Sequence, residues 1–285
     1  MKIASGLMLS FFAVTNAANL LTTCTSLQGV VVPCLNDTTK GTTTKLDRST
    51  DQTYNFSNLN ITAIQDLPPD SKYVDLSYNQ ISEISRGLPS TLSFLNLSHN
   101  TLKANWTKIQ LPVSTLDLSY NQGGLLWNGD YFWEMNVPQI ARLVFRGNQL
   151  STVKWTTSNF PFFRSYLHAL DLSDNPRLVV YGDSNVIDRI KSNIALTADA
   201  SSYDDTLKVC GNRTEKIVNL DILPVLNYTL QGDAQYGNAL TDQKFAACSL
   251  NYTDLYTPPP NGAVNRRVEG AVLGLVSLVV LYMGL

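Results

Sequence analysis

A short motif recurs along the middle of this chain and constrains its fold more than any other feature. Each copy alternates apolar and polar residues and ends in Asn; the five copies are Val74–Asn79, Leu95–Asn100, Leu116–Asn121, Leu143–Asn148 and Leu170–Asn175. The terminal asparagines lie 21, 21, 27 and 27 residues apart. A sixth, degenerate copy precedes them at 56–64, with Leu59 in place of the Asn. Self-similarity at this period predicts an array of stacked repeats.

Each copy predicts one short β-strand followed by a tight bend. Alternating residues of a strand point to opposite faces, so Leu95 and Leu97 would enter the core while Asn96 points outward. At the bend, the repeated Asn can hydrogen-bond neighbouring backbone groups and join a ladder of its counterparts. We therefore assign a structural role to the ladder asparagines Asn79, Asn100, Asn121, Asn148 and Asn175.

The five copies resemble the leucine-rich repeat (LRR) pattern LxxLxLxxNxL over residues 54–180. The chain is similar to the ectodomains of LRR receptor-like proteins and receptor kinases. This resemblance implies an α/β-type solenoid, a horseshoe or arc with a parallel β-sheet on its concave side and short irregular segments on its convex side. Because stacked repeats bury their apolar faces only against neighbours, both ends need caps. We expect an N-terminal cap at 18–53 and the last coils with a C-terminal cap at 181–256.

The two ends of the chain have the composition of processing signals. Residues 1–17 combine a basic start, an apolar run and small residues, as in a secretory signal peptide. At the other end, a Pro-rich spacer at 257–270 precedes the apolar segment 271–285, a pattern typical of a glycosylphosphatidylinositol (GPI) attachment signal. We expect attachment at Asn261, with Gly262 or Ala263 as alternatives. The competing interpretations are a short single-pass anchor and a retained tail.

Cysteines, glycosylation motifs and composition predict the same extracellular compartment. Of the three possible pairings, Cys24 with Cys34 and Cys210 with Cys248 would staple each end locally. The chain has 25 Asn, 26 Thr and 24 Ser, and this polar, uncharged content indicates an extracellular surface. The Asn-x-Ser/Thr glycosylation motifs are Asn36, Asn55, Asn60, Asn96, Asn105, Asn212, Asn227 and Asn251.

The concave face of the predicted sheet is the expected ligand surface. Aromatic residues and Arg dominate interface hot spots, and the candidates of these types are Tyr73, Tyr78, Phe94, His99, Tyr120, Arg142 and Arg146. An outward column of Asp75, Asp117 and Asp171 also suggests a metal or catalytic site. We favour a solvated, structural column with no raised pKa, and assign no catalytic residue, metal or cofactor. A glycan on Asn96 would stand in the middle of this face, so we expect Asn96 unmodified or ligands to one side.

The two 27-residue spacings carry additional aromatic residues. These include Trp127, Tyr131, Phe132, Trp133, Trp155, Phe160, Phe162, Phe163 and Tyr166. Either they form protruding binding loops, or, as we favour, their rings fill wider coils.

The resemblance implies a non-enzymatic cell-surface recognition or adhesion protein held in the outer membrane leaflet by a lipid. Its partners would be a protein, peptide or glycan ligand and, for signalling, a transmembrane co-receptor. A net charge of −2 without a basic run excludes the usual electrostatics of nucleic-acid binding. Two alternatives remain: a structural glycosylated wall or coat protein, and a secreted decoy that inhibits a foreign enzyme.

Overall fold

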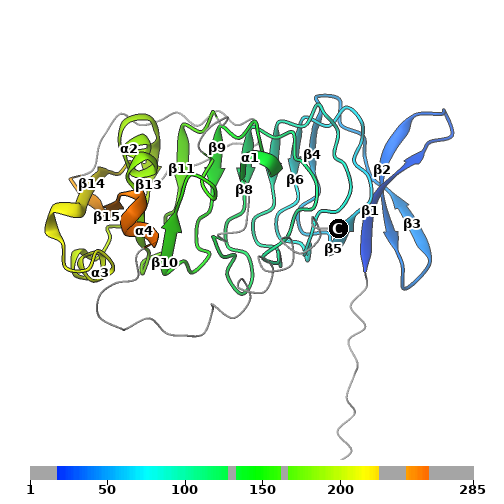
Figure 1. Ribbon diagram of the computed structural model, residues 1–285. Coiled ribbons are helices and arrows are strands. Elements are labelled where there is room, and N and C mark those ends of the chain that lie inside the picture. Colours follow the sequence, from blue (N-terminus) through cyan, green and yellow to red (C-terminus); the bar gives the residue numbers. More distant parts are fainter. Residues whose placement is uncertain (1–17, 128–132, 162–165, 225–241, 257–285) are drawn as a thin grey trace, which may run out of the picture.

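A computed structural model describes residues 18–127, 133–161, 166–224 and 242–256 of the 285-residue chain. In these residues the protein is an elongated α/β fold with three sheets and few helices (Figure 1). Signal segment 1–17, spacer and tail 257–285, Asn227 and Asn261 lie outside the described residues, as do Tyr131, Phe132, Phe162 and Phe163.

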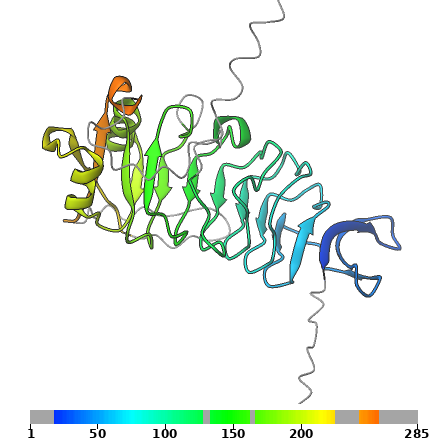
Figure 2. The same ribbon diagram turned by 60° about the horizontal axis from the view of Figure 1, so that its bottom comes forward.

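The central sheet is parallel, as predicted. Its strands, in spatial order, are β13 (Ala195–Thr197), β11 (Ala169–Asp171), β9 (Arg142–Val144), β8 (Thr115–Asp117), β7 (Phe94–Asn96), β6 (Tyr73–Asp75) and β4 (Thr53–Asn55). Chain order and spatial order therefore agree along the whole sheet. Each of the five sequence copies contributes one strand, and the strands lie side by side along the long axis of the molecule (Figures 1 and 2).

One buried side chain from each strand centre builds the core beneath this sheet. The strands pair without a register shift, so Val74, Leu95 and Leu116 lie opposite one another and are fully buried. Burying an aliphatic side chain of this size contributes about 1.5–3 kcal/mol. A second buried row follows two residues later, formed by Phe56, Leu76, Leu97, Leu118, Phe145 and Leu172. The period-two alternation in the sequence thus becomes a continuous apolar layer.

The aromatic residues of the two longer spacings fill the interior. Trp127 lies within 5.3–6.1 Å, centroid to centroid, of Trp133, Phe145, Trp155 and Phe160. All five side chains are buried, and the short helix α1 (Trp133–Asn136) contributes one of them. The described rings therefore support the wider-coil interpretation. Only Tyr166 of the described aromatics in these segments is exposed, at 76%.

The N-terminal end is covered by a second sheet with the order β3 (Thr42–Lys45), β2 (Val31–Asp37), β1 (Asn19–Thr25) and β5 (Ile61–Ile64). Strands β1, β2 and β3 form an antiparallel meander, whereas β5 pairs with β1 in parallel. Segment 61–64, expected within the repeats, thereby joins the cap to the first repeat. The predicted disulfide Cys24–Cys34 is present and ties β1 to β2.

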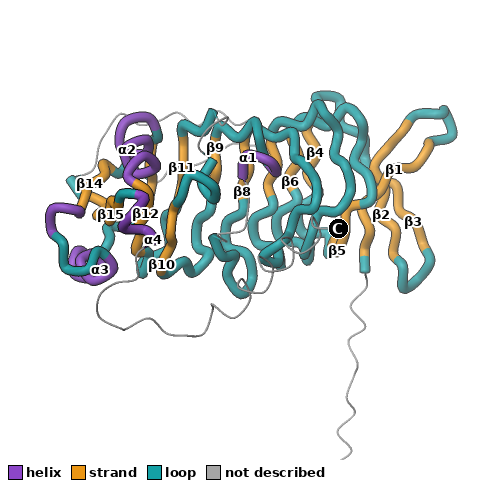
Figure 3. The backbone as a smooth tube through the Cα atoms, viewed as in Figure 1, coloured by secondary structure: helices purple, strands orange, loops and turns teal. Residues whose placement is uncertain are grey.

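The C-terminal end combines a third sheet with most of the helices (Figure 3). Its strand order is β10 (Thr152–Trp155), β12 (Val179–Asp183), β15 (Lys244–Leu250) and β14 (Ile217–Asp221). The helical segments are α2 (Ser184–Asn193), α3 (Tyr203–Val209), η1 (Thr214–Lys216) and α4 (Tyr252–Tyr256).

Local chemistry sets the boundaries of the C-terminal helices. Asp183 caps α2 by accepting a hydrogen bond from the Asn185 amide, and Ser202 caps α3 in the same way through the Asp205 amide. The predicted disulfide Cys210–Cys248 joins the end of α3 to β15. In the described residues, no helix is long and apolar enough to span a membrane.

Candidate functional site

The ladder asparagines hold consecutive repeats together and are not available to a ligand. Asn100 is 1% exposed, accepts a hydrogen bond from the Ile81 amide (2.9 Å), and donates to the Leu76 and Leu97 carbonyls (2.9 and 3.1 Å). The amide groups of Asn79, Asn100, Asn121 and Asn175 donate to the backbone of their own bend and of the preceding repeat, and that of Asn148 donates to the Leu118 carbonyl of the preceding repeat. The predicted bonds to neighbouring backbone groups are thus present, and the structure also shows a hydrogen bond between two ladder residues, from the Asn121 backbone amide to the Asn148 side chain (3.1 Å).

The side chains in the outward column of acidic residues also form hydrogen bonds with the backbone. Asp75, Asp117 and Asp171 each accept a hydrogen bond from the amide of the Ser two residues later, at 2.8, 2.9 and 3.0 Å. Asn96 makes the same bond to Ser98 (2.9 Å). This local pattern is an Asx turn, which satisfies an amide as the chain leaves the strand. The column is therefore primarily a device for shaping the bend.

The prediction that this column is fully solvated, with no raised pKa, is wrong at its C-terminal end. Asp171 is 2% exposed and forms an ion pair with Arg146 (2.5 Å), whose side chain is 17% exposed. Burial raises the pKa of Asp117, against the opposing effects of its Ser119 hydrogen bonds and the charge of Arg146. The apolar Val144 is paired with both Asp117 and Asp171 in the sheet, where the N-terminal strands have another polar residue at this position.

Two predicted ligand residues are buried and leave the candidate surface. Phe94 is 5% and Arg142 is 7% exposed. Both lie at the start of interior strands, with paired residues on each side; Phe94 is opposite Tyr73 and Thr115. At the strand spacing of about 4.8 Å, side chains at paired positions contact one another, but flanking strands alone do not decide burial, because Thr115 is also paired on both sides and is half-buried. Tyr73, nearer the sheet edge, stays partly accessible, and the Lys72 ammonium lies 5.2 Å from its ring centroid.

Three of the predicted residues, Tyr78, His99 and Tyr120, assemble into a stack that we call the aromatic column. The Tyr78 and His99 rings are 4.1 Å apart and 8° from parallel, and the His99 and Tyr120 rings are 4.9 Å apart and 17° from parallel. Tyr78 is 58% and Tyr120 36% exposed. The three residues lie in the bends that follow β6, β7 and β8, and each comes immediately before a ladder asparagine.

Left-handed backbone geometry brings these rings together. The φ angles of Tyr78, His99 and Tyr120 are 54°, 52° and 51°, a conformation that costs about 1–2 kcal/mol for each such residue. Two stacked pairs return about 0.5–1.5 kcal/mol each. Backbone hydrogen bonds from Tyr78, His99 and Tyr120 to the following repeat, 2.8–3.1 Å long, supply further stabilisation. The column is thus held by the fold and not by stacking alone.

The C-terminal end of the column is closed. The Tyr120 hydroxyl donates a hydrogen bond to Asp174 across Gly147, and a Cβ at Gly147 would lie 2.2 Å from the Tyr120 ring. Burial and the Asp174 bond raise the pKa of Tyr120 to about 12. Burial lowers the pKa of His99, so its imidazole is neutral at pH 7. Both rings are uncharged under ordinary conditions.

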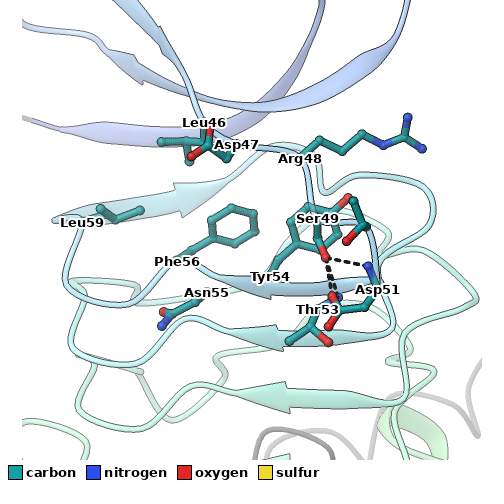
Figure 4. Close-up of a pocket in the computed structure, with 11 residues that line it drawn as sticks. Leu46, Asp47, Arg48, Ser49, Asp51, Thr53, Tyr54, Asn55, Phe56 and Leu59 are labelled. Atoms are coloured by element: carbon teal, nitrogen blue, oxygen red, sulfur yellow. Dashed lines mark hydrogen bonds between the residues drawn. The ribbon is translucent and has the colours of Figure 1, made fainter.

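A pocket that the sequence analysis did not anticipate lies between the N-terminal cap and β4 (Figure 4). Its volume is about 500 Å³, and segment 46–51 forms one wall. Several polar groups of this wall have partners within the protein: Arg48 pairs with Asp70, outside the pocket (3.2 Å), and Ser49 donates to Asp51 (2.5 Å). The only available sequence signal was the polar run 47–51. Because these partners are satisfied, the aromatic column is the stronger candidate site.

The glycosylation motifs differ in accessibility. Asn55, Asn60, Asn105, Asn212 and Asn251 are exposed, whereas Asn36 and Asn96 are half-buried. His168, directly before β11, is exposed. The described segments contain no group of three or more His, Cys, Asp or Glu residues suited to a metal ion.

Comparison with protein-family models, curated proteins and solved structures finds no match to this chain.

Proposed function

We propose that this protein is an extracellular leucine-rich-repeat protein that recognises a ligand through one face and edge of its central sheet. Support for the repeat assignment comes from agreement between two patterns. The 21- and 27-residue spacings of the motif coincide with successive parallel strands. Each terminal Asn of the motif is buried and bonded to the backbone, as a solenoid of stacked repeats requires.

Two disulfides indicate an oxidising, extracellular or secreted environment. We further propose that the protein resides on the outer face of the plasma membrane. The support is the composition of the spacer and apolar segment at 257–285, which is typical of GPI attachment. Recognition at that surface would involve a protein, peptide or glycan ligand, with a transmembrane co-receptor as a further partner.

The observation that carries the recognition proposal is the exposure of the aromatic column. Tyr78 and Tyr120 are large, partly apolar side chains that remain 58% and 36% exposed. Their hydroxyl groups add directional hydrogen bonding, and rigid amphipathic rings of this kind dominate interface hot spots. Because the rings are already stacked, little side-chain entropy is lost when a ligand binds. A purely structural role would not require rings at an exposed edge.

The test is a binding screen with the full-length protein displayed on eukaryotic cells. A library of labelled extracellular proteins, peptides and glycans is applied to cells carrying wild type, Tyr78→Asn or Tyr120→Asn. Asn tolerates the left-handed backbone at these positions, so each variant removes the ring and retains the bend. Tyr203→Asn, which changes a 48% exposed tyrosine in α3, is the matched control.

We expect at least one ligand whose binding to wild type and Tyr203→Asn is strong and whose binding to the two column variants is reduced about tenfold or more. A screen in which every bound ligand is indifferent to both column variants contradicts the proposal. Surface staining with an antibody to a folded epitope establishes equal display of the four proteins.

A further inference from the structure

The N-terminal end of the aromatic column is open, in contrast to its closed C-terminal end. His99 covers one face of the Tyr78 ring at 4.1 Å. The preceding residue in the column is Asn58, whose amide donates to Ser77 as the Tyr78 amide donates to Ser98, both at 3.1 Å. Asn58 also has a left-handed backbone (φ 57°) and is exposed. The stack therefore ends where a short amide replaces a ring.

We propose that the open face of Tyr78 binds a pyranose ring of an external glycan, one whose hydroxyl groups and glycosidic bonds are all equatorial. In such β-linked, gluco-configured sugars, the C–H bonds project axially and give the ring flat apolar faces. A tyrosine ring stacks on a flat face of this kind, whereas an axial hydroxyl would hold the two rings apart. This inference rests on the proposed recognition function and names its ligand class.

Neutral hydrogen-bonding groups surround the bends at this end of the column. Asn58, Asn60 and Gln80 are exposed. Asn58 occupies, in the preceding repeat, the position that Tyr78 occupies in its own. Asn60 and Gln80 are equivalent to each other, because each comes directly after the ladder position of its repeat. A side-chain amide offers both a donor and an acceptor, which suits sugar hydroxyl groups that also do both. The neutral imidazole of His99 behind Tyr78 adds no charge to the platform.

The geometry also favours a glycan over a charged peptide. The carboxylate nearest to the other end of the column, Asp174, is bonded to the Tyr120 hydroxyl. The outward column of acidic residues accepts hydrogen bonds from serine backbone amides. The exposed Tyr78 ring and the exposed amides of the same bends are thus the combination that binds an uncharged molecule with apolar faces and many hydroxyl groups.

The experiment titrates the full-length protein, extracted from eukaryotic cells in detergent, with three oligosaccharides. Cellohexaose and chitohexaose are β-linked and gluco-configured, while β-1,4-mannohexaose has the same linkage with an axial hydroxyl on each ring. Isothermal titration calorimetry compares wild type with Tyr78→Asn and Tyr78→Phe. Tyr203→Asn again serves as the matched control.

We expect cellohexaose or chitohexaose to bind wild type, Tyr78→Phe and Tyr203→Asn, and to lose about tenfold or more in affinity with Tyr78→Asn. Mannohexaose should bind more weakly than both. The proposal is overturned if neither gluco-configured probe binds, if Tyr78→Asn binds them like wild type, or if mannohexaose binds equally well.

A further arm examines the protein's own glycan at Asn60. Thr62→Ala removes this glycosylation motif and keeps the Asn60 amide. Binding that appears only in Thr62→Ala shows that the protein's own sugar covers Tyr78, and this also overturns the proposal. If the library screen instead finds a protein or peptide ligand that depends on Tyr78, the glycan inference fails and the recognition function stands. If no ligand depends on the column, both fail.

Discussion

Replacing a ladder asparagine should destabilise the protein far more than replacing an exposed one. Asn79 is 6% exposed and accepts hydrogen bonds from the Leu59 and Ile61 amides at 3.0 and 2.9 Å. Its own amide donates to the Phe56, Leu76 and Ser77 carbonyls at 2.9, 2.9 and 3.0 Å. Asn79→Ala removes every one of these bonds, and the methyl group that remains satisfies none of the partners.

The expected loss of stability comes from the backbone amides that no longer have the Asn79 side chain as their hydrogen-bond acceptor. An unsatisfied buried amide costs about 1–3 kcal/mol. Ile61 is fully buried, so its amide incurs this cost, whereas water can reach Leu59, which is half-buried. The carbonyls have a second lone pair and lose less. We therefore expect the free energy of unfolding to fall by about 3 kcal/mol.

Urea unfolding at pH 7 with the disulfides intact measures this loss. All four tryptophans are buried in the repeats, so their fluorescence reports on the packed array. With a urea dependence near 3 kcal/mol per molar, the midpoint should fall by about 1 M. Asn193→Ala, an exposed change at the end of α2, should alter the free energy by less than about 0.5 kcal/mol. Equal midpoints for the two variants would refute the reasoning, because the amides would then have other acceptors.

Three further predictions concern the column, the acidic row and the membrane. Gly147→Ala should lower the urea midpoint and change the tyrosine near-UV circular dichroism, because its Cβ displaces Tyr120; Gly29→Ala has the same backbone strain with nothing within 4 Å and should leave that spectrum unchanged. Since burial raises the pKa of Asp117 above its ordinary 3.8, the contribution of this residue to stability should be present below that pH and be lost as the pH rises through the raised pKa. Because Asp117→Asn alone would create a glycosylation motif with Ser119, the comparison uses a Ser119→Ala background. There Asp117→Asn should raise the urea midpoint at pH 7 but not at pH 3, and a lower midpoint at pH 7 contradicts this. Phosphatidylinositol-specific phospholipase C should release the full-length protein from eukaryotic cells; retention, with control anchors cleaved, would instead indicate a short membrane span.

Features that depend on neighbours close in the chain were predictable from the sequence. Apolar alternation at Leu95 and Leu97 defines a strand and its buried face, because side-chain direction has a period of two. Asn at the bend is a local hydrogen-bonding requirement, and cysteines 10 and 38 residues apart pair within one end of the molecule. These rules act over a few residues or one compact segment, so no knowledge of the assembled protein was needed.

The tertiary structure alone decided which outward residues reach solvent. Phe94 and Arg142 are buried, whereas Tyr73, which follows the same alternation and is likewise paired on both sides, stays partly exposed. The reach of Tyr120 to Asp174, 54 positions away, depends on the absence of a side chain at Gly147. Exposure and pKa are set by side chains from other repeats, 20 or more residues distant. The chain therefore encodes its strands and bends locally, while the exposure of its surface residues is decided only when the strands pair into the central sheet.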